Sequence, residues 1–241
     1  MIKIKVLASS SLGNCYKISD GRTSLLIEAG IPIKKIKQGL NFKLHEIEGC
    51  LITHEHGDHI KAAVDVAGNG INIYMSKGTL KNYGYYGFGL FKFNIISSKE
   101  GFEIGTWIIK PFDVDHDAAE PLGFLLFSKH TKEKLLYLTD TFYTKYTYPK
   151  MNYIMIECNH SYKILDDNVA AGRLHPAQKK RLIQSHMALE NVKDMLKAND
   201  LSKVKEIYLI HLSDGNSSAE QFKKEIQELT GKPTFIAGER G

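Results

Sequence analysis

The chain has 241 residues, of which 43% are hydrophobic and 24% are charged. This is the composition of an ordinary globular protein with enough apolar residues for a core, and it excludes a disordered or fibrous chain. The formal net charge of +5 is a mild argument for an anionic substrate such as a phosphodiester, because a basic surface attracts anions.

No run reaches the roughly 18 apolar residues that are needed to span a bilayer, and residues 1–6 lack the long apolar stretch of a signal peptide. The three cysteines, Cys15, Cys50 and Cys158, form no CxxC pair, and any pairing leaves one over. A reducing compartment suits this pattern better than a disulfide framework does. We therefore expect a cytoplasmic protein without a membrane segment, folded as one domain over residues 1–241.

Short strands dominate the first part of the chain, where β-branched residues are punctuated by glycine and aspartate. Strands are predicted over residues 2–8, 14–18, 24–28 and 49–53, and helices over residues 33–40 and 59–67. Further strands are predicted over residues 71–75, 104–109, 123–127, 134–138 and 153–156.

The last third of the chain contains more helix. Helices are predicted over residues 176–184, 189–197 and 219–229, and strands over residues 207–212 and 234–237. Ser217 and Glu220 have the spacing of a capping box for the last helix. Two blocks of strands with interleaved helices predict an α/β (α+β) fold, in which two sheets pack face to face with helices outside as a four-layer αββα sandwich.

One segment, Tyr83–Phe93, is rich in aromatic residues and glycine. The favoured interpretation is a loop that packs on the core or on a partner subunit, which would make the protein a homodimer. The second interpretation is a surface on which nucleic-acid bases stack.

Four metal-ligating side chains fall within six positions directly after the apolar run 50–53: His54, His56, Asp58 and His59. A strand end that enters a tight turn at Gly57 can aim alternate side chains at one point, and the helix that follows can aim two more at a second point. Imidazole nitrogen and carboxylate oxygen are ligands for zinc, manganese or iron. Solvated loop histidines are the alternative, which this register disfavours.

Three further ligands occupy the same kind of place, the end of an apolar strand. They are His116, Asp140 and His211. This regularity is what an active site on one rim of a sandwich requires.

The pattern HxHxDH at residues 54–59, followed by a lone histidine, a lone aspartate and a late histidine, resembles the metallo-β-lactamase superfamily. The resemblance implies two divalent metal ions, Zn²⁺ or Mn²⁺. The implied ligands of the first ion are His54, His56 and His116. Those of the second ion are Asp58, His59 and His211, and Asp140 would bridge the two ions.

Within the superfamily, the chain is similar to the WalJ (YycJ) branch and its phage-encoded relatives, which are regarded as DNA exonucleases. The segments that carry this likeness are 8–16, 116–123, 157–160, 185–191 and 211–213. The chain departs from the common bacterial form by having Met187-Ala188 where Leu-Ser is usual and Asp140-Thr141-Phe142 where Asp-Thr-Gly is common. These departures concern the substrate rather than metal binding.

His186 resembles the histidine that stands beside the metals in nucleic-acid-processing branches, including the tRNA 3′-end endonuclease, and that a carboxylate orients. Glu157 would be that carboxylate here, and His186 would protonate the leaving oxygen or bind the scissile phosphate. A helix-capping or surface histidine is the alternative. Asp58 would orient the attacking water, while Ser10 and Asn14 are expected near the metals as substrate contacts, with a structural turn as the alternative.

The remaining histidines, His45, His130, His160 and His175, are interpreted as surface residues. The basic run 179–181 is interpreted as a solvated helix face, with phosphate contact as the second interpretation.

The sequence thus predicts a two-metal-dependent phosphodiester hydrolase that acts on nucleic acid, most simply a DNA exonuclease, with DNA favoured over RNA. A small-molecule hydrolase of a cyclic nucleotide, thioester or lactam is the first alternative. A diiron oxidoreductase would favour a carboxylate at His56, and a non-catalytic binding module would not be expected to keep the complete ligand set.

Overall fold

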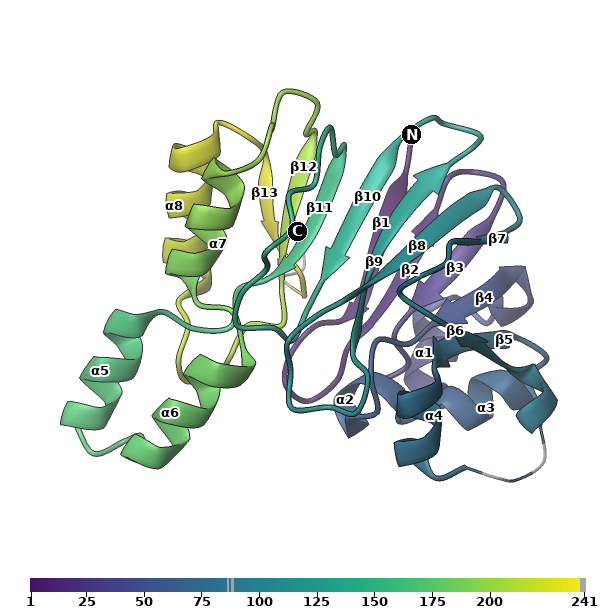
Figure 1. The fold of residues 1–241 in the computed structure, drawn as a ribbon, viewed down its shortest axis with the longest axis horizontal. Helices are drawn as coiled ribbons and strands as arrows, with labels where there is room; N and C mark the ends of the chain where they lie inside the picture. Colours follow the sequence, from purple (N-terminus) through teal and green to yellow (C-terminus); the bar gives the residue numbers. More distant parts are fainter. Residues whose placement is uncertain (86, 88, 239–241) are drawn as a thin grey trace. The chain divides into compact units, whose positions relative to one another are not determined.

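The computed structural model describes residues 1–85, 87 and 89–238, and the chain divides into two compact units (Figure 1). Unit 1 comprises Met1–Asp113 and Ala118–Glu133, and unit 2 comprises Val114–Asp117 and Lys134–Gly241. The single domain expected from the sequence stays a prediction. Within the described residues, no helix is both long and apolar enough to cross a membrane.

Unit 1 contains a six-stranded sheet of mixed direction, with its strands in sequence order. The strands are β1 (Lys3–Ala8), β2 (Cys15–Ser19), β3 (Ser24–Ile27), β4 (Ile47–Leu51), β5 (Asn72–Ser76) and β6 (Phe93–Ile96). The pairs β1–β2 and β2–β3 are antiparallel, whereas β3–β4, β4–β5 and β5–β6 are parallel. The parallel strands are mainly apolar and mostly buried, with Glu48 of β4 and Ile95 of β6 exposed.

Helices supply part of the core of unit 1. They are α1 (Ile33–Gly39), α2 (Gly57–Ile60), α3 (Ala63–Gly68) and α4 (Lys77–Tyr83), with short 3₁₀ turns η1 (Leu44–Glu46) and η2 (Leu90–Lys92). Ile36 of α1 and Val66 of α3 are fully buried in one cluster with Leu26, Cys50 and Ile73 of the sheet. Three antiparallel strands complete the unit: β7 (Phe102–Ile104), β8 (Trp107–Asp113) and β9 (Leu122–Ser128).

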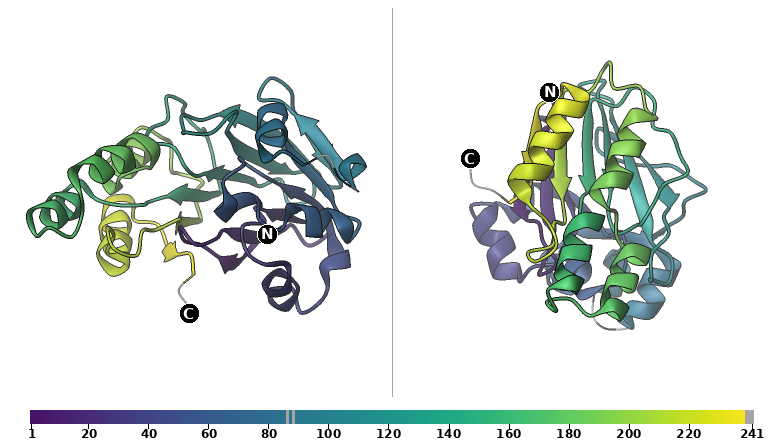
Figure 2. Two further views of the ribbon diagram at one scale, coloured as in Figure 1. Left: turned by 90° about the horizontal axis from the view of Figure 1, so that it is seen from below. Right: turned by 90° about the vertical axis from the view of Figure 1, so that its left-hand side faces the viewer.

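Unit 2 is built on four parallel strands and four helices. The strands are β10 (Lys134–Leu138), β11 (Tyr153–Glu157), β12 (Glu206–Ile210) and β13 (Thr234–Ile236). The helices are α5 (Tyr162–Ala170), α6 (Pro176–Ser185), α7 (Leu189–Lys197) and α8 (Ala219–Thr230). Helices α7 and α8 pack against each other, and α8 packs on β13 (Figure 2).

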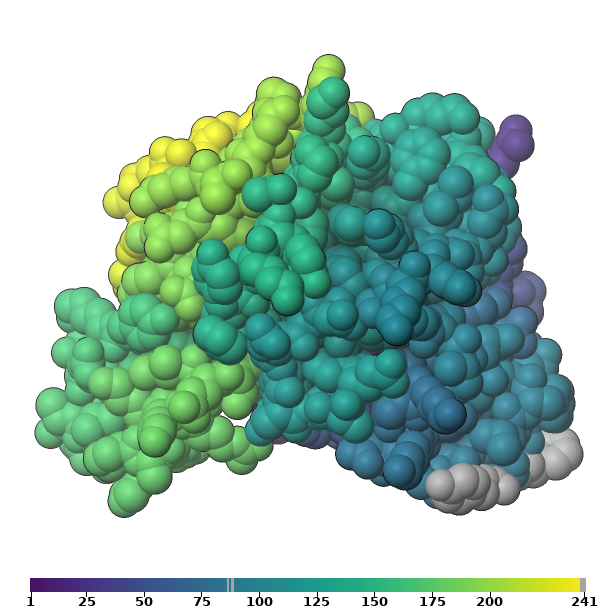
Figure 3. All heavy atoms as spheres, in the orientation of Figure 1, coloured from purple at the N-terminus to yellow at the C-terminus, as the bar shows by residue number. Residues whose placement is uncertain are grey.

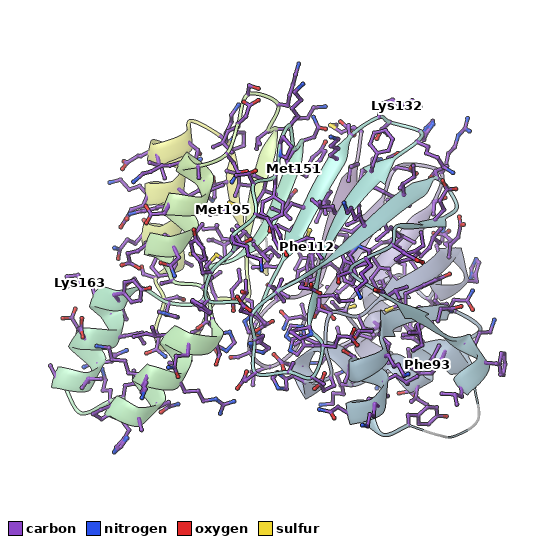
Figure 4. The ribbon with its side chains drawn as sticks, in the orientation of Figure 1. Phe93, Phe112, Lys132, Met151, Lys163 and Met195 are labelled. Atoms are coloured by element: carbon purple, nitrogen blue, oxygen red, sulfur yellow. The ribbon has the colours of Figure 1, made fainter. Side chains whose placement is uncertain are left out.

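Helix α7 buries an apolar face that includes Met195, and α5 carries the exposed Lys163. Figure 4 labels these two residues. Helices α5 and α6 contact each other as a hairpin. In the chain this hairpin separates Glu157 from His186, so the fold must bring these two residues back together.

Most predicted elements are confirmed, although several bounds differ. The predicted strand 104–109 is divided by the turn of the β7–β8 hairpin at Gly105, which has a φ of 53°. The predicted helix 59–67 breaks between α2 and α3, and the predicted strands 49–53 and 207–212 end at Leu51 and Ile210. No capping box forms, since the N-cap of α8 is Ser218 and the Ser217 hydroxyl donates to the Ser213 carbonyl at 2.7 Å.

The aromatic segment Tyr83–Phe93 falls partly on Tyr86 and Phe88, which lie outside the described residues. Among its described members, Tyr83 and Tyr85 pack against the hydrophobic core of unit 1 and Phe93 belongs to it. Phe91 is exposed. These contacts agree with the favoured interpretation of a loop that packs on the core.

Candidate metal centre and its supporting residues

Unit 1 brings the first two histidines of the motif together after β4. The Nε2 atom of His54 lies 3.0 Å from the Nδ1 atom of His56, and the His54 side chain is buried. Two nitrogens that bind one zinc ion at about 2.0–2.1 Å with tetrahedral geometry are separated by about 3.4 Å. The pair therefore has the donor chemistry and close to the spacing that one metal ion requires.

The other two ligands of the motif lie on the short helix α2. The Asp58 carboxylate lies 3.3 Å from His59 Nε2, and the rings of His54 and His59 have their centroids 4.2 Å apart. All four predicted ligands of this motif thus lie close together within unit 1. Gly57 itself has no positive φ, and an added Cβ there would meet nothing within 4 Å, so the expected glycine-dependent turn is an ordinary helix start.

Glu28 supports this cluster, and sequence reasoning missed it. Its carboxylate is fully buried, accepts the Thr53 hydroxyl at 2.6 Å, and lies 3.4 Å from His59 Nδ1. The same hydroxyl lies 2.9 Å from His54 Nδ1. Metal-binding histidines usually have their second ring nitrogen held by such a group, which fixes the ring and its tautomer. The place of Glu28 directly after an apolar run was the signal available in the sequence.

Asn14 and Gly30 hold the backbone that carries the α2 ligands. The Asn14 amide N–H donates to the Asp58 carbonyl at 2.8 Å, and its side chain lies 3.4 Å from both Asp58 Oδ2 and His59 Nε2. The Gly30 N–H donates to the Asn14 carbonyl at 2.8 Å. Asn14 is fully buried, and Ser10 accepts from its side chain through the backbone carbonyl. Substrate binding by Ser10 and Asn14 stays a prediction.

Unit 2 presents Asp140 and His211 at the ends of two parallel strands. Both residues have left-handed backbones, with φ values of 47° and 54°. Such conformations are uncommon outside glycine, cost energy, and concentrate at functional sites. The turn ends each strand, and both side chains then lie within reach of one buried carboxylate, that of Glu157.

Glu157 is the centre of the unit 2 cluster. It ends β11 with no exposed surface, and its Oε1 atom lies 2.7 Å from His186 Nδ1 and 3.0 Å from His211 Nδ1. Its Oε2 atom accepts the backbone N–H groups of Met187 and Thr141 at 3.1 and 3.3 Å. Burial raises the pKa of Glu157, but the charge of His186 and the hydrogen bonds with His186 and His211 outweigh burial and lower it.

His186 lies between two carboxylates, since its Nδ1 atom is also 3.1 Å from Asp140 Oδ1. Burial lowers its pKa, but Glu157 and Asp140 have the larger combined effect and raise the pKa to about 11. A ligand atom from each of four residues lies within 4.8 Å of the others, a spacing that suits a cation. These residues are Asp140, Glu157, His186 and His211.

His116 lies in the same unit, beside His186. Its ring centroid is 5.5 Å from that of His186, and its Nδ1 atom lies 2.9 Å from the Ser185 carbonyl, to which it can donate. That hydrogen bond would leave Nε2 as the metal-binding nitrogen. Burial lowers the pKa of His116, which favours the neutral imidazole that metal binding needs.

Sequence reasoning placed His160 wrongly and did not single out Asn159, two residues that shortly follow Glu157 in the chain. His160 was expected at the surface, but it is fully buried, because the backbone of residue 160 bridges to Ala188 between the helices of unit 2. Burial lowers its pKa to about 4. Asn159, which was not singled out, donates through its side chain to the His211 carbonyl at 3.0 Å and so supports that ligand. The other three surface histidines are exposed.

The basic run on α6 is partly engaged in ion pairs. Lys179 pairs with Asp166 of α5, and Arg181 lies 3.3 Å from Asp117, the neighbour of His116. Lys180 is exposed. The pairs agree with the interpretation of a solvated helix face.

The comparisons with known proteins bear on both ligand clusters. The family described as a β-lactamase superfamily domain matches residues 25–212. The chain belongs to the metallo-β-lactamase superfamily. It is 33% identical to exodeoxyribonuclease WalJ of Streptococcus pneumoniae serotype 2, over 90% of this chain and 84% of that protein. It is 27% identical to exodeoxyribonuclease YycJ of Bacillus anthracis, over 99% and 92%.

The metallo-β-lactamase fold is also seen among solved structures. The protein YhfI of Bacillus subtilis, described as a metallo-β-lactamase fold protein, matches with a TM-score of 0.73 and 14% identity, over 98% of this chain and 97% of that one. The predicted α/β sandwich and the predicted superfamily are therefore confirmed. The clusters of both units contain the histidines and carboxylates that a divalent metal accepts, so the residues present fit the metals that this superfamily implies.

Proposed function

We propose that this chain is a metal-dependent nuclease, and specifically an exonuclease that removes nucleotides from DNA ends. The observation that carries the proposal is the contact between the buried Glu157 carboxylate and the partly exposed His186 ring, 2.7 Å apart, next to the carboxylate of Asp140. The relatives named exodeoxyribonucleases, which match at 27–33% identity over most of the chain, support the same activity. They also favour DNA over RNA.

The metal ligands are proposed from the family resemblance and from the donor chemistry of each cluster. His54, His56 and His116 would bind one divalent ion, Asp58, His59 and His211 the other, and Asp140 both. The ions would be Zn²⁺ or Mn²⁺, and they would activate water and offset the charge of the phosphate. Glu28 and Asn159 would hold the rings and backbone of these ligands in place.

His186 would serve the departing oxygen. Its Nδ1 atom faces Glu157, so Nε2 is the nitrogen available to the substrate. The carboxylates of Glu157 and Asp140 raise the pKa of the imidazole, and a protonated ring can donate to the phosphate or to the leaving oxygen. A positioned acid of this kind contributes about 10²–10⁴-fold to rate. Asp58 would orient the attacking water.

The test is hydrolysis of end-labelled single- and double-stranded DNA and RNA by the purified protein with Mn²⁺ or Zn²⁺. The wild-type protein is expected to shorten DNA stepwise. Asp58→Ala should lose this activity because it loses metal, whereas His186→Ala should lose the activity and keep the metal. His45→Ala, which removes an exposed histidine of unit 1, is the matched control. Intact nucleic acid together with cleavage of a small phosphodiester would overturn the proposal in favour of a nucleotide hydrolase.

Two further features belong to the proposal. The three reduced cysteines and the nucleic-acid substrate support a cytoplasmic protein. The exposed Phe91 supports a homodimer through the aromatic segment, and sedimentation of the wild-type chain beside Phe91→Ser would test it. A monomeric wild-type protein would contradict the homodimer.

A further inference from the structure

Three large aromatic side chains are exposed on one short segment of unit 2, Thr141–Lys150, called the aromatic loop below. Phe142 is 40% exposed, Tyr143 is 51% exposed and Tyr146 is 37% exposed. The loop connects β10 to β11, and its atoms lie at the molecular surface on the face shown in Figure 3. Exposed aromatic side chains gathered in this way are a common mark of a binding surface.

The aromatic loop is tied down by its backbone. The Asn191 side chain of α7 donates to the Phe142 carbonyl at 2.7 Å, and the Thr141 hydroxyl donates to the Tyr143 carbonyl at 2.8 Å. Further along, Tyr148 is buried and its N–H donates to the Asn199 side chain. The rings are therefore displayed by an anchored backbone, which lowers the entropy lost when a ligand binds.

The loop is continuous with the candidate site. It begins at the residue after Asp140, and the Thr141 N–H donates to Glu157, the carboxylate that holds His186. The Thr141 hydroxyl also accepts the Asp115 N–H at 3.2 Å, next to His116. A ligand on Phe142 and Tyr143 would therefore lie beside the groups that act on phosphate.

The charge of the loop favours an anion. Residues 141–150 contain Lys145 and Lys150 and no acidic residue. The Lys145 Nζ atom lies over the Tyr146 ring, 5.5 Å from its centroid. Aromatic faces on which bases stack, flanked by cations that follow the phosphate backbone, are the elements of single-strand recognition.

We infer that the aromatic loop stacks the unpaired bases of a single-stranded DNA end next to the cleavage site. Bases inside a duplex are covered by their neighbours, so only a single strand, or an end that has frayed, offers faces to Phe142 and Tyr143. This inference rests on the proposed nuclease function and specifies its substrate as a single strand.

The experiment measures the binding of a labelled, phosphorothioate-linked single strand and of a blunt duplex by anisotropy, with Phe142→Ala, Tyr143→Ala and the double variant. Phe42→Ala is the matched control, because Phe42 is 71% exposed in unit 1, far from the loop in the chain. Each loop variant is expected to bind the single strand at least about fivefold more weakly, since stacking contributes roughly fivefold to over a hundredfold per base. Duplex binding should change less.

A strand with abasic positions near the labelled end separates stacking from other causes. It should bind the wild-type chain more weakly, while the double variant should bind the abasic and intact strands equally. Phe142→Trp should restore affinity. The inference would be overturned if the loop variants lost as much affinity for the abasic strand as for the intact strand. It would also be overturned if the variants changed the oligomeric state and left binding unchanged.

The same series tells apart the failure of this inference and the failure of the proposed function. If the wild-type chain shortens DNA and the loop variants bind and shorten single strands normally, only the inference is wrong. If the wild-type chain shortens no nucleic acid, the proposed function is wrong as well.

Discussion

At the scale of single residues, Glu157 links more of the unit 2 cluster than any predicted ligand does. One carboxylate oxygen faces both His186 and His211, and the other accepts two backbone N–H groups. A buried carboxylate without such partners would be strongly destabilised. Here the four contacts offset burial, so one side chain fixes a proposed acid and a proposed metal ligand at once.

Replacing Glu157 with glutamine should therefore impair catalysis and metal binding together. The shape stays nearly the same, but the neutral amide oxygen accepts from two imidazole N–H groups more weakly than a charged carboxylate oxygen does. We expect nuclease activity to fall about 10–100-fold, the usual effect of losing a group that orients a ligand. Activity and bound metal would be measured beside Glu206→Gln, which changes a carboxylate of β12 that accepts from Tyr208. Unchanged activity would contradict the role.

The proposed ligands could be named from the sequence, because HxHxDH places four donors in one register and strand ends collect the rest. Glu28 and Asn159 were not predictable in the same way. Their roles depend on groups that are distant in the chain, the Thr53 hydroxyl for Glu28 and the His211 carbonyl for Asn159. His160 was misplaced at the surface because its polar neighbours in sequence gave no sign that the backbone pairs with Ala188.

At the scale of elements, the placement of α2 depends on a close approach by Gly30. A Cβ added to Gly30 would lie 1.6 Å from the Asp58 carbonyl oxygen and 2.8 Å from the His59 nitrogen. The backbone there cannot tolerate a side chain without moving the two ligands of α2. Nothing in the sequence distinguishes this glycine from Gly57, whose Cβ would meet open space.

Gly30→Ala should thus weaken metal binding by displacing α2 and should lower the free energy of unfolding by about 1–3 kcal/mol, the range for overpacked sites. Gly68→Ala at the end of α3 is the control, because a Cβ there meets nothing within 4 Å. Urea unfolding in the presence of a chelator measures the change in the free energy of unfolding. Zinc titration measures the metal affinity of each variant. Normal zinc affinity in Gly30→Ala would argue against the displacement.

A second element-scale device is Asp20, which ties the β2–β3 turn to β9 and to the β7–β8 turn within unit 1. Its carboxylate accepts the hydroxyls of Thr106 and Ser128, both at 2.6 Å. Burial raises the pKa of Asp20, but these hydroxyls and two backbone N–H groups outweigh it and lower the pKa from 3.8 to about 2. The folded chain therefore stabilises the charged form of the Asp20 carboxylate more than the unfolded chain does.

The sign of the pH dependence follows from that depressed pKa. Stabilisation by Asp20 is complete above the unfolded value of 3.8 and is lost as the pH falls towards about 2. Asp20→Asn should cost about 2 kcal/mol of unfolding free energy at neutral pH, and the difference should shrink across that acidic window. Urea unfolding at several pH values, beside the exposed control Asp194→Asn, would measure it. A pH-independent difference would contradict the assignment.

Strands and helices with clear periodicity were predicted almost to the residue, as for β10 and α7. The missed elements, α4, β6 and α5, are short or mixed in polarity, and their packing partners decide their structure. The β7–β8 hairpin was predicted as one strand because its turn rests on a single glycine at positive φ.

At the scale of the whole molecule, the proposed ligands come from both compact units, with His59 in unit 1 and His211 in unit 2. Metal that binds only the folded chain must stabilise it by mass action, by about 2.7 kcal/mol at a hundredfold excess over Kd. For a chain of this size that is a rise in Tm of about 5–10 °C.

His59→Ala and His211→Ala should each remove most of that metal-dependent rise. Thermal unfolding with Zn²⁺ and with a chelator measures it for both variants and for the wild-type chain. His45→Ala and His130→Ala, exposed histidines of unit 1, should keep the full rise. A rise that survives in either ligand variant would show that the corresponding unit takes no part in binding the metal.

The three cysteines can be used to follow the opening of each unit. All are fully buried, and burial raises the pKa of each thiol, so neither access nor thiolate is available while the chain is folded. Cys15 and Cys50 lie in unit 1 and Cys158 lies in unit 2. A small alkylating reagent therefore modifies each unit only when that unit opens, and peptide masses recorded over time would give the opening rates of the two halves from one unaltered chain.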